Sequence, residues 1–267
     1  MAPDRGGMVL SSVRKCLPLV LGALFAWMPA AQGMAAPEAE QPTPGACKAG
    51  HLFLTIDTGN MAGADHIAEV LRAEHVRVTF FIANEPTFRG DRALDPHWEN
   101  YWRDRVAEGH VFGNHTWSHV GVRRMIGTKR VSGTDLDGKT VEFDHDSFCS
   151  DLTKVDERFQ AITGRRLAPI WRAPAGRVFP RTLDWASSCG FAKHVGWTPN
   201  GFLGDELPSE RFSNQVLLDQ AFARVRDGDV LMMHLGIRSR KEPFAAAFRP
   251  LVAGLKQRGF CFDTVKP

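Results

Sequence analysis

Apolar residues along this chain follow two alternating patterns. Short runs rich in β-branched and aromatic residues, such as residues 52–57 and 76–83, predict β-strands. Between these runs, Ile67, Val70 and Leu71 recur at helical spacing and predict a helix over residues 64–75. On the same grounds we expect further helices at residues 98–108, 150–162, 182–189, 213–225 and 244–258, and further strands at residues 110–114, 167–171, 191–196, 230–234 and 260–265.

Strands that alternate with helices predict an α/β domain with a mainly parallel sheet. We expect one such domain over residues 49–267, either a barrel or a closed doubly wound sheet. Residues 121–146 interrupt the alternation, and their Gly, Asp and Thr residues indicate an irregular loop. In folds of this kind, the chemistry gathers where strands end and loops begin.

The N-terminal segment has the features of a secretory signal peptide. Arg14 and Lys15 precede a short apolar run at residues 17–28, and small residues follow it. An uncleaved membrane anchor is the alternative, although a membrane span needs about 20 apolar residues. We therefore expect residues 1–36 to be removed, residues 37–48 to form a linker, and the chain to be periplasmic or secreted with no stable membrane span.

Composition excludes few other classes of function. The chain of 267 residues is 43% hydrophobic and 24% charged, which is ordinary for a globular protein. Its net charge of +3 falls to +1 without residues 1–36, because that segment carries three basic residues and one acidic residue. A nucleic-acid partner would need a basic stripe, so we expect none. We expect the chain to be a monomer.

Four cysteines remain after Cys16 is lost with the leader. An even number in an exported chain is compatible with two disulfides, although three pairings of four cysteines are possible. We choose Cys47–Cys261, because one residue precedes the first predicted strand and the other lies in the last, and Cys149–Cys189, which would tie two helices. Four buried free thiols are the alternative.

His115 and His119 are candidates for metal ligands. On a helical or tight-turn segment, their spacing of four residues places both imidazoles on one side. Two neutral imidazoles suit Zn, Fe, Co or Ni and leave room for a carboxylate and a water molecule. A chance spacing of this kind is common. The pair gains weight because it follows a predicted strand while Asp57 ends another.

Three further polar residues stand at predicted strand ends. Asp57 could be a general base or a metal ligand, or it could cap the following helix. Arg172 could hold Asp57 in its ionised form, or it could form a purely structural ion pair. His234 could protonate a leaving amine, or it could be a satisfied core histidine.

Five segments at successive strand ends together resemble a known family. They are residues 55–59, 115–119, 172–176, 197–200 and 231–234. In this order they resemble the polysaccharide deacetylase family, the NodB homology domains of carbohydrate esterase family 4. The resemblance covers residues 52–265 and is most specific at residues 109–119. It implies a distorted (β/α) barrel with about seven parallel strands.

The resemblance also implies an activity, a cofactor and a set of site residues. The activity is metal-dependent removal of N-acetyl groups from an amino-sugar polysaccharide, either peptidoglycan or an exopolysaccharide. The divalent metal would be zinc, with cobalt or nickel as alternatives, bound by His115 and His119. The implied catalytic residues are Asp57 as base, Arg172 as its partner and His234 as acid. The residues implied at the substrate are Trp117, Pro174, Trp197 and Asn200.

Three positions depart from the family pattern. Thr58 stands where the family has a second aspartate that binds the metal, and its neutral hydroxyl is a poorer ligand. Ala175 replaces an aromatic residue, whose place Phe179 could take. Asn200 replaces an aspartate that pairs with the last histidine, and Asp205 could substitute for it.

The departures leave two other functions open. One is a degenerate glycan-binding protein without catalysis, and the other is a hydrolase of a different amide. The retention of five polar residues at strand ends, Asp57, His115, His119, Arg172 and His234, favours activity. A carboxylate from Glu142, Asp144 or Asp146 could replace the missing ligand, but a solvated acidic loop is the simpler interpretation.

Overall fold

The computed structural model describes residues 47–267. The expected signal peptide, residues 1–36, lies outside the described residues, as does most of the expected linker at residues 37–48. Among residues 47–267, no helix is both long enough and apolar enough to span a membrane.

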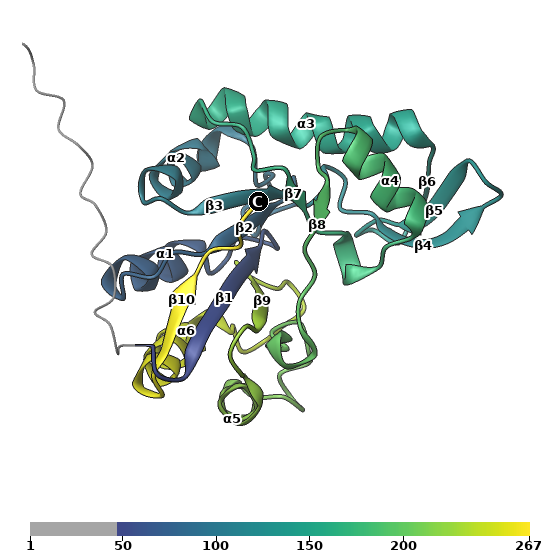
Figure 1. The fold of residues 1–267 in the computed structure, drawn as a ribbon. Helices are drawn as coiled ribbons and strands as arrows, with labels where there is room; N and C mark the ends of the chain where they lie inside the picture. The colour runs from purple at the N-terminus through teal and green to yellow at the C-terminus, as the bar shows by residue number, and fades with distance from the viewer. Residues whose placement is uncertain (1–46) are drawn as a thin grey trace, which may run out of the picture. The chain divides into compact units, whose positions relative to one another are not determined.

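A curled parallel sheet of seven strands organises the domain (Figure 1). Its order is β10-β1-β2-β3-β7-β8, and β9 also pairs with β1. Because β2 and β9 both pair with residues 55–57, they lie on opposite edges of β1. The predicted α/β class, with about seven parallel strands in a distorted barrel, is confirmed. The strands are β1 (Gly50–Asp57), β2 (Thr79–Ile82), β3 (Val111–Asn114), β7 (Ile170–Trp171), β8 (Lys193–His194), β9 (Val230–His234) and β10 (Phe260–Asp263).

Helices connect the strands in the alternating order that the sequence predicts. In α1, the residues at helical spacing, Ile67, Val70 and Leu71, are buried against the core. The helices are α1 (Ala64–Ala73), α2 (Glu99–Ala107), α3 (His145–Thr163), α4 (Pro180–Ser188), α5 (Asn214–Arg224) and α6 (Ala245–Gln257), and the short 3-10 turns are η1 (Pro96–Trp98), η2 (Pro174–Gly176) and η3 (Pro199–Gly201).

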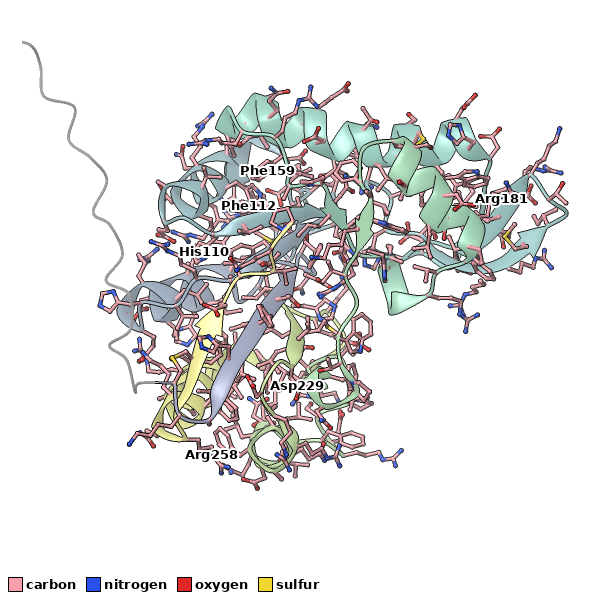
Figure 2. The ribbon with its side chains drawn as sticks, viewed as in Figure 1. His110, Phe112, Phe159, Arg181, Asp229 and Arg258 are labelled. Carbon is pink, nitrogen blue, oxygen red and sulfur yellow. A yellow bond between two sulfur atoms is a disulfide. The ribbon has the colours of Figure 1, made fainter. Side chains whose placement is uncertain are left out.

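Aromatic side chains fill the space between the sheet and the helices on one face. The rings of Phe112 in β3 and Phe159 in α3 lie 4.8 Å apart (Figure 2). Phe80 in β2 stacks on Phe112 at 5.6 Å and meets Trp102 of α2 edge to face at 6.1 Å. Large rings of this kind bury much apolar surface each, so the strands that carry the candidate site residues are firmly held from behind.

The expectation of an irregular loop at residues 121–146 is wrong. The segment forms a three-stranded antiparallel sheet of β4 (Gly121–Ile126), β5 (Arg130–Thr134) and β6 (Thr140–Phe143). Gly127 and Gly138 supply the positive φ angles, 58° and 82°, at the two hairpin turns. Only one face of the sheet is apolar and its strands are short, so the sequence shows more turn residues than strand pattern.

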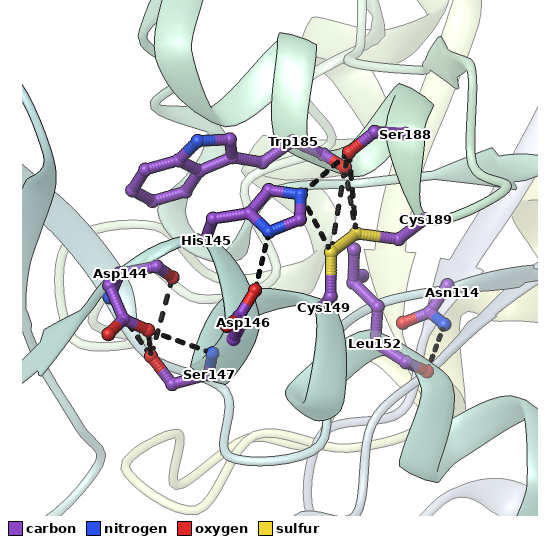
Figure 3. The surroundings of a disulfide bond; sticks show 10 residues. All are labelled: Asn114, Asp144, His145, Asp146, Ser147, Cys149, Leu152, Trp185, Ser188 and Cys189. Atoms are coloured by element: carbon purple, nitrogen blue, oxygen red, sulfur yellow. Dashed lines mark hydrogen bonds and ion pairs between the residues drawn. A yellow bond between two sulfur atoms is a disulfide. The ribbon is translucent and has the colours of Figure 1, made fainter.

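Two disulfide bonds link cysteines within residues 47–267, and they are the two pairings chosen from the sequence. Cys47–Cys261 joins the segment before β1 to β10, and Cys149–Cys189 joins α3 to the residue that follows α4 (Figure 3). The second bond encloses β7 and Arg172 within its covalent loop.

Candidate active site

The predicted site residues meet at the carboxyl edge of the parallel sheet. Asp57 ends β1 and His234 ends β9, and the two residues are direct partners in the register of these strands. His115 follows β3, and Arg172 follows β7. Since the paired strands are parallel, their carboxyl ends lie at the same edge, which is where such sheets place their reacting groups.

Arg172 anchors Asp57. Its Nη1 donates to Asp57 Oδ1 at 2.7 Å, and its side chain is fully buried. Burial alone would raise the pKa of Asp57, but Arg172 outweighs it and, with His115 and His234, holds the pKa below its ordinary value. Asp57 is therefore an ionised, oriented carboxylate at neutral pH.

The remaining donors of Arg172 bind the protein itself. Nη2 donates to Thr55 Oγ1 at 2.8 Å and to the carbonyl oxygen of Gly196 at 3.0 Å, and Nε donates to the carbonyl oxygen of Val195 at 3.0 Å. The guanidinium also lies 4.2 Å above the ring of Phe81. Arg172 thus orients Asp57 and also holds the chain after β8, so its two interpretations are compatible.

A tight turn, rather than a helix, positions His115 and His119. Thr116 and His119 have positive φ angles of 66° and 51°. The side chain of Asn114 holds the turn, because its Oδ1 accepts from the amide of Thr116 at 2.9 Å and its Nδ2 donates to the carbonyl oxygen of Leu152 at 2.8 Å. The two imidazole rings end 4.9 Å apart.

The hydrogen bonds of His115 define its tautomer. Nδ1 lies 2.9 Å from the carbonyl oxygen of Arg172, which can only accept, so Nδ1 carries the proton. Burial lowers the pKa of His115 to about 3, so the ring is neutral. Its Nε2 lone pair then faces Asp57 Oδ2 across 3.6 Å. His115 Nε2 is therefore an electron-pair donor that is free to bind a metal ion.

His119 supplies a second nitrogen that the protein leaves free. Within residues 47–267, its buried Nδ1 has no hydrogen-bond partner. Its Nε2 lies 3.9 Å from Oε1 of Glu85. Two imidazoles with carboxylates nearby form a donor set that zinc, cobalt and nickel accept, so these residues fit the divalent metal that the family resemblance implies.

Thr58 does not fit the role of metal ligand that its position suggested. Its hydroxyl donates to the carbonyl oxygen of Phe81 at 3.0 Å and accepts from the amide of Ala83 at 2.8 Å. These bonds tie β1 to β2 and leave the side chain facing the neighbouring backbone. The physical reason is that a short neutral side chain gains more from two strand amide groups than from a cation.

His234 takes its charge partner from Asp205 and not from Asn200. Asp205 Oδ2 accepts from the amide of His234 at 2.7 Å, and Nδ1 of the ring lies 3.2 Å from both carboxylate oxygens. Burial would lower the pKa of His234, but Asp205 raises it to about 10. Asn200 is exposed in η3. His234 is therefore a protonated imidazolium at neutral pH.

The residues expected at the substrate occupy different settings around this edge. Trp117 is partly buried, with Lys154 Nζ 4.2 Å from its ring. Pro174 is buried at the start of η2, and the ring of Trp197 stacks on Phe202 at 6.4 Å. Their contact with a substrate stays a prediction.

The aromatic position of the family is not refilled by Phe179. Phe179 packs against the hydrophobic core at the start of α4. Ala175 is exposed and has a φ of 57°, a left-handed conformation in which a larger side chain would be strained. The wall that an aromatic residue would form here is therefore absent from this loop.

The acidic residues at positions 142–146 have partners at the surface, outside the candidate site. Glu142 pairs with Arg130 at 2.8 Å, Asp144 caps α3 through the amide of Ser147, and Asp146 contacts His145 (Figure 3). They agree with the simpler interpretation of a solvated acidic segment.

A second group of metal-type side chains includes the Cys149–Cys189 disulfide. Ligand atoms of His145, Cys149 and Cys189 lie within 4.8 Å of one another (Figure 3). The two sulfur atoms are bonded to each other, so they are not thiolate ligands.

Glu85 is the site residue that the sequence reasoning missed. It is buried three residues after β2, and its Oε1 accepts from the amide of Gly59 at 2.9 Å. The signal that could have found it is its place after an apolar strand, the same criterion that selected Asp57.

Known proteins share both the sequence pattern and the fold. The family model for polysaccharide deacetylases matches residues 45–194. The peptidoglycan-N-acetylglucosamine deacetylase of Bacillus cereus is 23% identical over 214 residues, which are 79% of this chain and 66% of that protein. The chain therefore spans about two thirds of that protein's length.

Two solved structures show the likeness of fold. A pseudoenzyme of carbohydrate esterase family 4 from Bacillus anthracis has a TM-score of 0.61 at 17% identity, covering 82% of this chain and 65% of that one. A family 4 acetyl xylan esterase from Clostridium thermocellum, in complex with a cobalt ion, has a TM-score of 0.61 at 20% identity, covering 80% and 87%.

Proposed function

The chain belongs to the polysaccharide deacetylase family, and from this premise we propose that it is a metal-dependent hydrolase that removes N-acetyl groups from an amino-sugar polysaccharide, either peptidoglycan or an exopolysaccharide. We further propose that it acts outside the cytoplasm as a monomer, after removal of residues 1–36. The Bacillus cereus relative, named for deacetylation of peptidoglycan, supports this substrate class.

The pairing of Asp57 and His234 carries the proposal. These register partners have opposite protonation states, because Arg172 keeps Asp57 ionised and Asp205 keeps His234 protonated. Neighbouring groups whose pKa values are driven apart are the mark of an acid and base pair. Hydrolysis of an amide needs both, one to take a proton from water and one to give a proton to the amine.

The chain's own residues can perform each proton transfer. When bound by His115 and His119, a divalent ion supplies a Lewis acid that polarises the acetyl carbonyl and the attacking water. Asp57 accepts a proton from the water molecule as the water oxygen attacks the acetyl carbon. As the bond between carbon and nitrogen breaks, His234 donates its proton to the departing amine. Acetate and a free amino sugar are the products.

We propose zinc as the ion, with cobalt or nickel as substitutes. Neutral His115 has Nε2 free of hydrogen-bond donors, and His119 turns its Nε2 towards Glu85, so each ring can offer a nitrogen to such an ion. The cobalt complex of the Clostridium thermocellum esterase supports cobalt in this fold.

Acetate release tests the proposal. The exported protein is incubated with N-acetylglucosamine oligomers, peptidoglycan and acetylated xylan, with zinc or cobalt and with a chelator. Chelator-sensitive release of acetate from the amino sugars supports the proposal. Bound metal without acetate from these substrates would indicate a different amide, and neither metal nor acetate would indicate a degenerate glycan-binding protein.

A further inference from the structure

Glu85 is a buried carboxylate without a permanent cationic partner. The residue is 7% exposed, and among the described residues its carboxylate contacts only the amide of Gly59 and, at 3.9 Å, Nε2 of His119. A buried carboxylate is costly unless it is paired or bound to a metal. The nitrogen that faces it, His119 Nε2, has no hydrogen bond within residues 47–267, and His234 interacts with Glu85 only through its charge. The space between Glu85 Oε1 and His119 Nε2 therefore suits a cation.

We propose that Glu85 is the carboxylate ligand of the metal, in place of the aspartate that residue 58 lacks. The ligand set is then His115, His119 and Glu85, which is two imidazoles and one carboxylate. This assignment rests on the proposed function, because it completes the metal site of the same reaction.

The order of the strands places Glu85 correctly for this role. β2 lies between β1, which carries Asp57, and β3, which leads to His115. Glu85 follows β2, so it leaves the sheet between the other two residues. Its carbonyl oxygen accepts from the amide of Ala93 at 2.9 Å, which fixes the backbone.

The measured separations are close to those of ligands on one ion. Two ligand atoms on a tetrahedral zinc ion lie about 3.4 Å apart, since each bond is about 2.1 Å long. The separation of Glu85 Oε1 and His119 Nε2 is 3.9 Å. A small rotation about the side-chain torsions of Glu85 closes this difference of about 0.5 Å, which a glutamate side chain accommodates easily.

Two other acids at this edge, Asp57 and Asp205, already have partners. Asp57 is bound by Arg172 through Oδ1, and Asp205 is bound by His234. Asp205 could not move onto the metal without leaving the buried imidazolium of His234 unpaired, which is strongly unfavourable. Glu85 has no such obligation, and its charge offsets part of the charge of a dication that two neutral imidazoles leave uncompensated.

Zinc affinity, measured without substrate, tests the assignment. The exported protein, with both disulfides intact, is titrated against a chromophoric chelator, and zinc per chain is counted after dialysis. Glu85→Gln should raise the dissociation constant for zinc by at least about 100-fold, more than loss of a group that only orients a ligand. Glu85→Asp keeps the charge, so its dissociation constant for zinc should lie between those of the parent protein and Glu85→Gln.

Two further variants separate a ligand from a structural residue. Asp205→Asn removes another buried acid at the same edge and should leave zinc affinity within about threefold of the parent protein, since it touches neither His115 nor His119. Adding Thr58→Asp to Glu85→Gln should restore binding, because it returns a carboxylate to the family's usual position. The rescue also shows that any loss in Glu85→Gln does not come from misfolding.

The outcomes distinguish this inference from the function on which it rests. Unchanged zinc affinity in Glu85→Gln, or an equal loss in Asp205→Asn, would overturn the assignment even if acetate release is observed. Loss of zinc in Glu85→Gln with rescue by Thr58→Asp would support it even if every tested glycan fails as a substrate.

Discussion

Asp57 illustrates how one carboxylate is committed to a single role by its neighbours. One oxygen is bound by Arg172, and the other faces the lone pair of His115. The bond to Arg172 keeps Asp57 ionised, and it leaves Oδ2 directed towards His115. A base in this position can take a proton only from a group that lies beside His115.

Asp57→Asn should therefore abolish turnover and spare the metal. We expect kcat to fall by about 10²- to 10⁴-fold, the usual contribution of a general base, with zinc per chain unchanged. His115→Ala should lose both turnover and zinc. Acetate assays and metal analysis of the same samples make the comparison. Retention of most activity in Asp57→Asn would mean that the base is assigned wrongly, and loss of its zinc would make Asp57 a ligand.

The pH dependence should report the charge that Asp205 places on His234. The reaction needs the protonated imidazole, so kcat/KM should hold at alkaline pH and fall as pH rises through about 10, the pKa of His234. Asp205→Asn removes the charge that raises this pKa, so the alkaline limb should move to lower pH, towards the ordinary value of 6.5. A profile that does not move would remove His234 from the role of acid.

The free energy of unfolding should also depend on pH, because the pKa of His234 is raised in the folded state. The folded state holds the proton of His234 more tightly than the unfolded state. The contribution of the pair to the free energy of unfolding is fully present below pH 6.5 and is lost as pH rises through about 10. In Asp205→Asn this slope should be smaller, because only Asp57 and Glu85 are then left to raise the pKa of His234.

At the scale of elements, the first turn of α3 fixes where the small antiparallel sheet ends. Asp144 and Ser147 form a capping box, in which Asp144 Oδ1 accepts from the amide of Ser147 at 2.9 Å and Ser147 Oγ bonds back to the amide of Asp144. The acidic side chain is thereby used for the helix.

Asp144→Ala should lower stability and leave catalysis alone. Loss of this cap should reduce the free energy of unfolding by about 1 kcal/mol, since the first amides of α3 lose their acceptor. Urea unfolding measures the loss, with Ser147→Ala as the matched change on the other side of the box. A fall in zinc affinity or kcat would revive the hypothesis that this segment supplies a metal ligand.

The elements show how far a sequence pattern extends. Residues 230–234 were predicted as a strand and are β9 with the same bounds, because Leu231, Met232 and Met233 form an uninterrupted run of buried apolar residues. Residues 167–171 and 191–196 were predicted as longer strands than β7 and β8, which have two residues each. At this part of the sheet, side-chain bonds from Arg172 and His194 replace regular pairing, and no periodicity records them.

The site residues also fall into those that the sequence pattern could identify and those that only the fold reveals. Residues that belong to ordered family segments, such as His115 and His234, could be found from the sequence. Glu85 could not, because its importance comes from the position of β2 between β1 and β3, which is a property of strand order. The partnership of Asp205 with His234 was only one option until the fold placed them together.

For the whole molecule, two covalent loops of different length constrain the unfolded chain. Cys149–Cys189 closes a loop with a sequence separation of 40, and Cys47–Cys261 one of 214. The chain-entropy model attributes more stabilisation to the longer loop, because more conformations of the unfolded chain are excluded.

Removal of each bond should therefore have unequal effects. Replacing Cys149 and Cys189 by Ser should lower the free energy of unfolding by about 4 kcal/mol, and replacing Cys47 and Cys261 by about 1.5 kcal/mol more. Guanidinium unfolding of the two double variants gives the difference. If the shorter loop proves to matter more, local packing around α3 and α4 outweighs the entropy of the unfolded chain.

Arg172 also closes the sheet. The chain after β8 runs beside β9, with Leu203 donating its amide to the carbonyl oxygen of Met232, and Arg172 holds the beginning of this segment through the carbonyl oxygens of Val195 and Gly196. A descendant that had given up catalysis would still use this arginine to hold the segment after β8. The presence of Arg172 in a relative is therefore weaker evidence of catalysis than the presence of Asp57 and His234, the proposed base and acid.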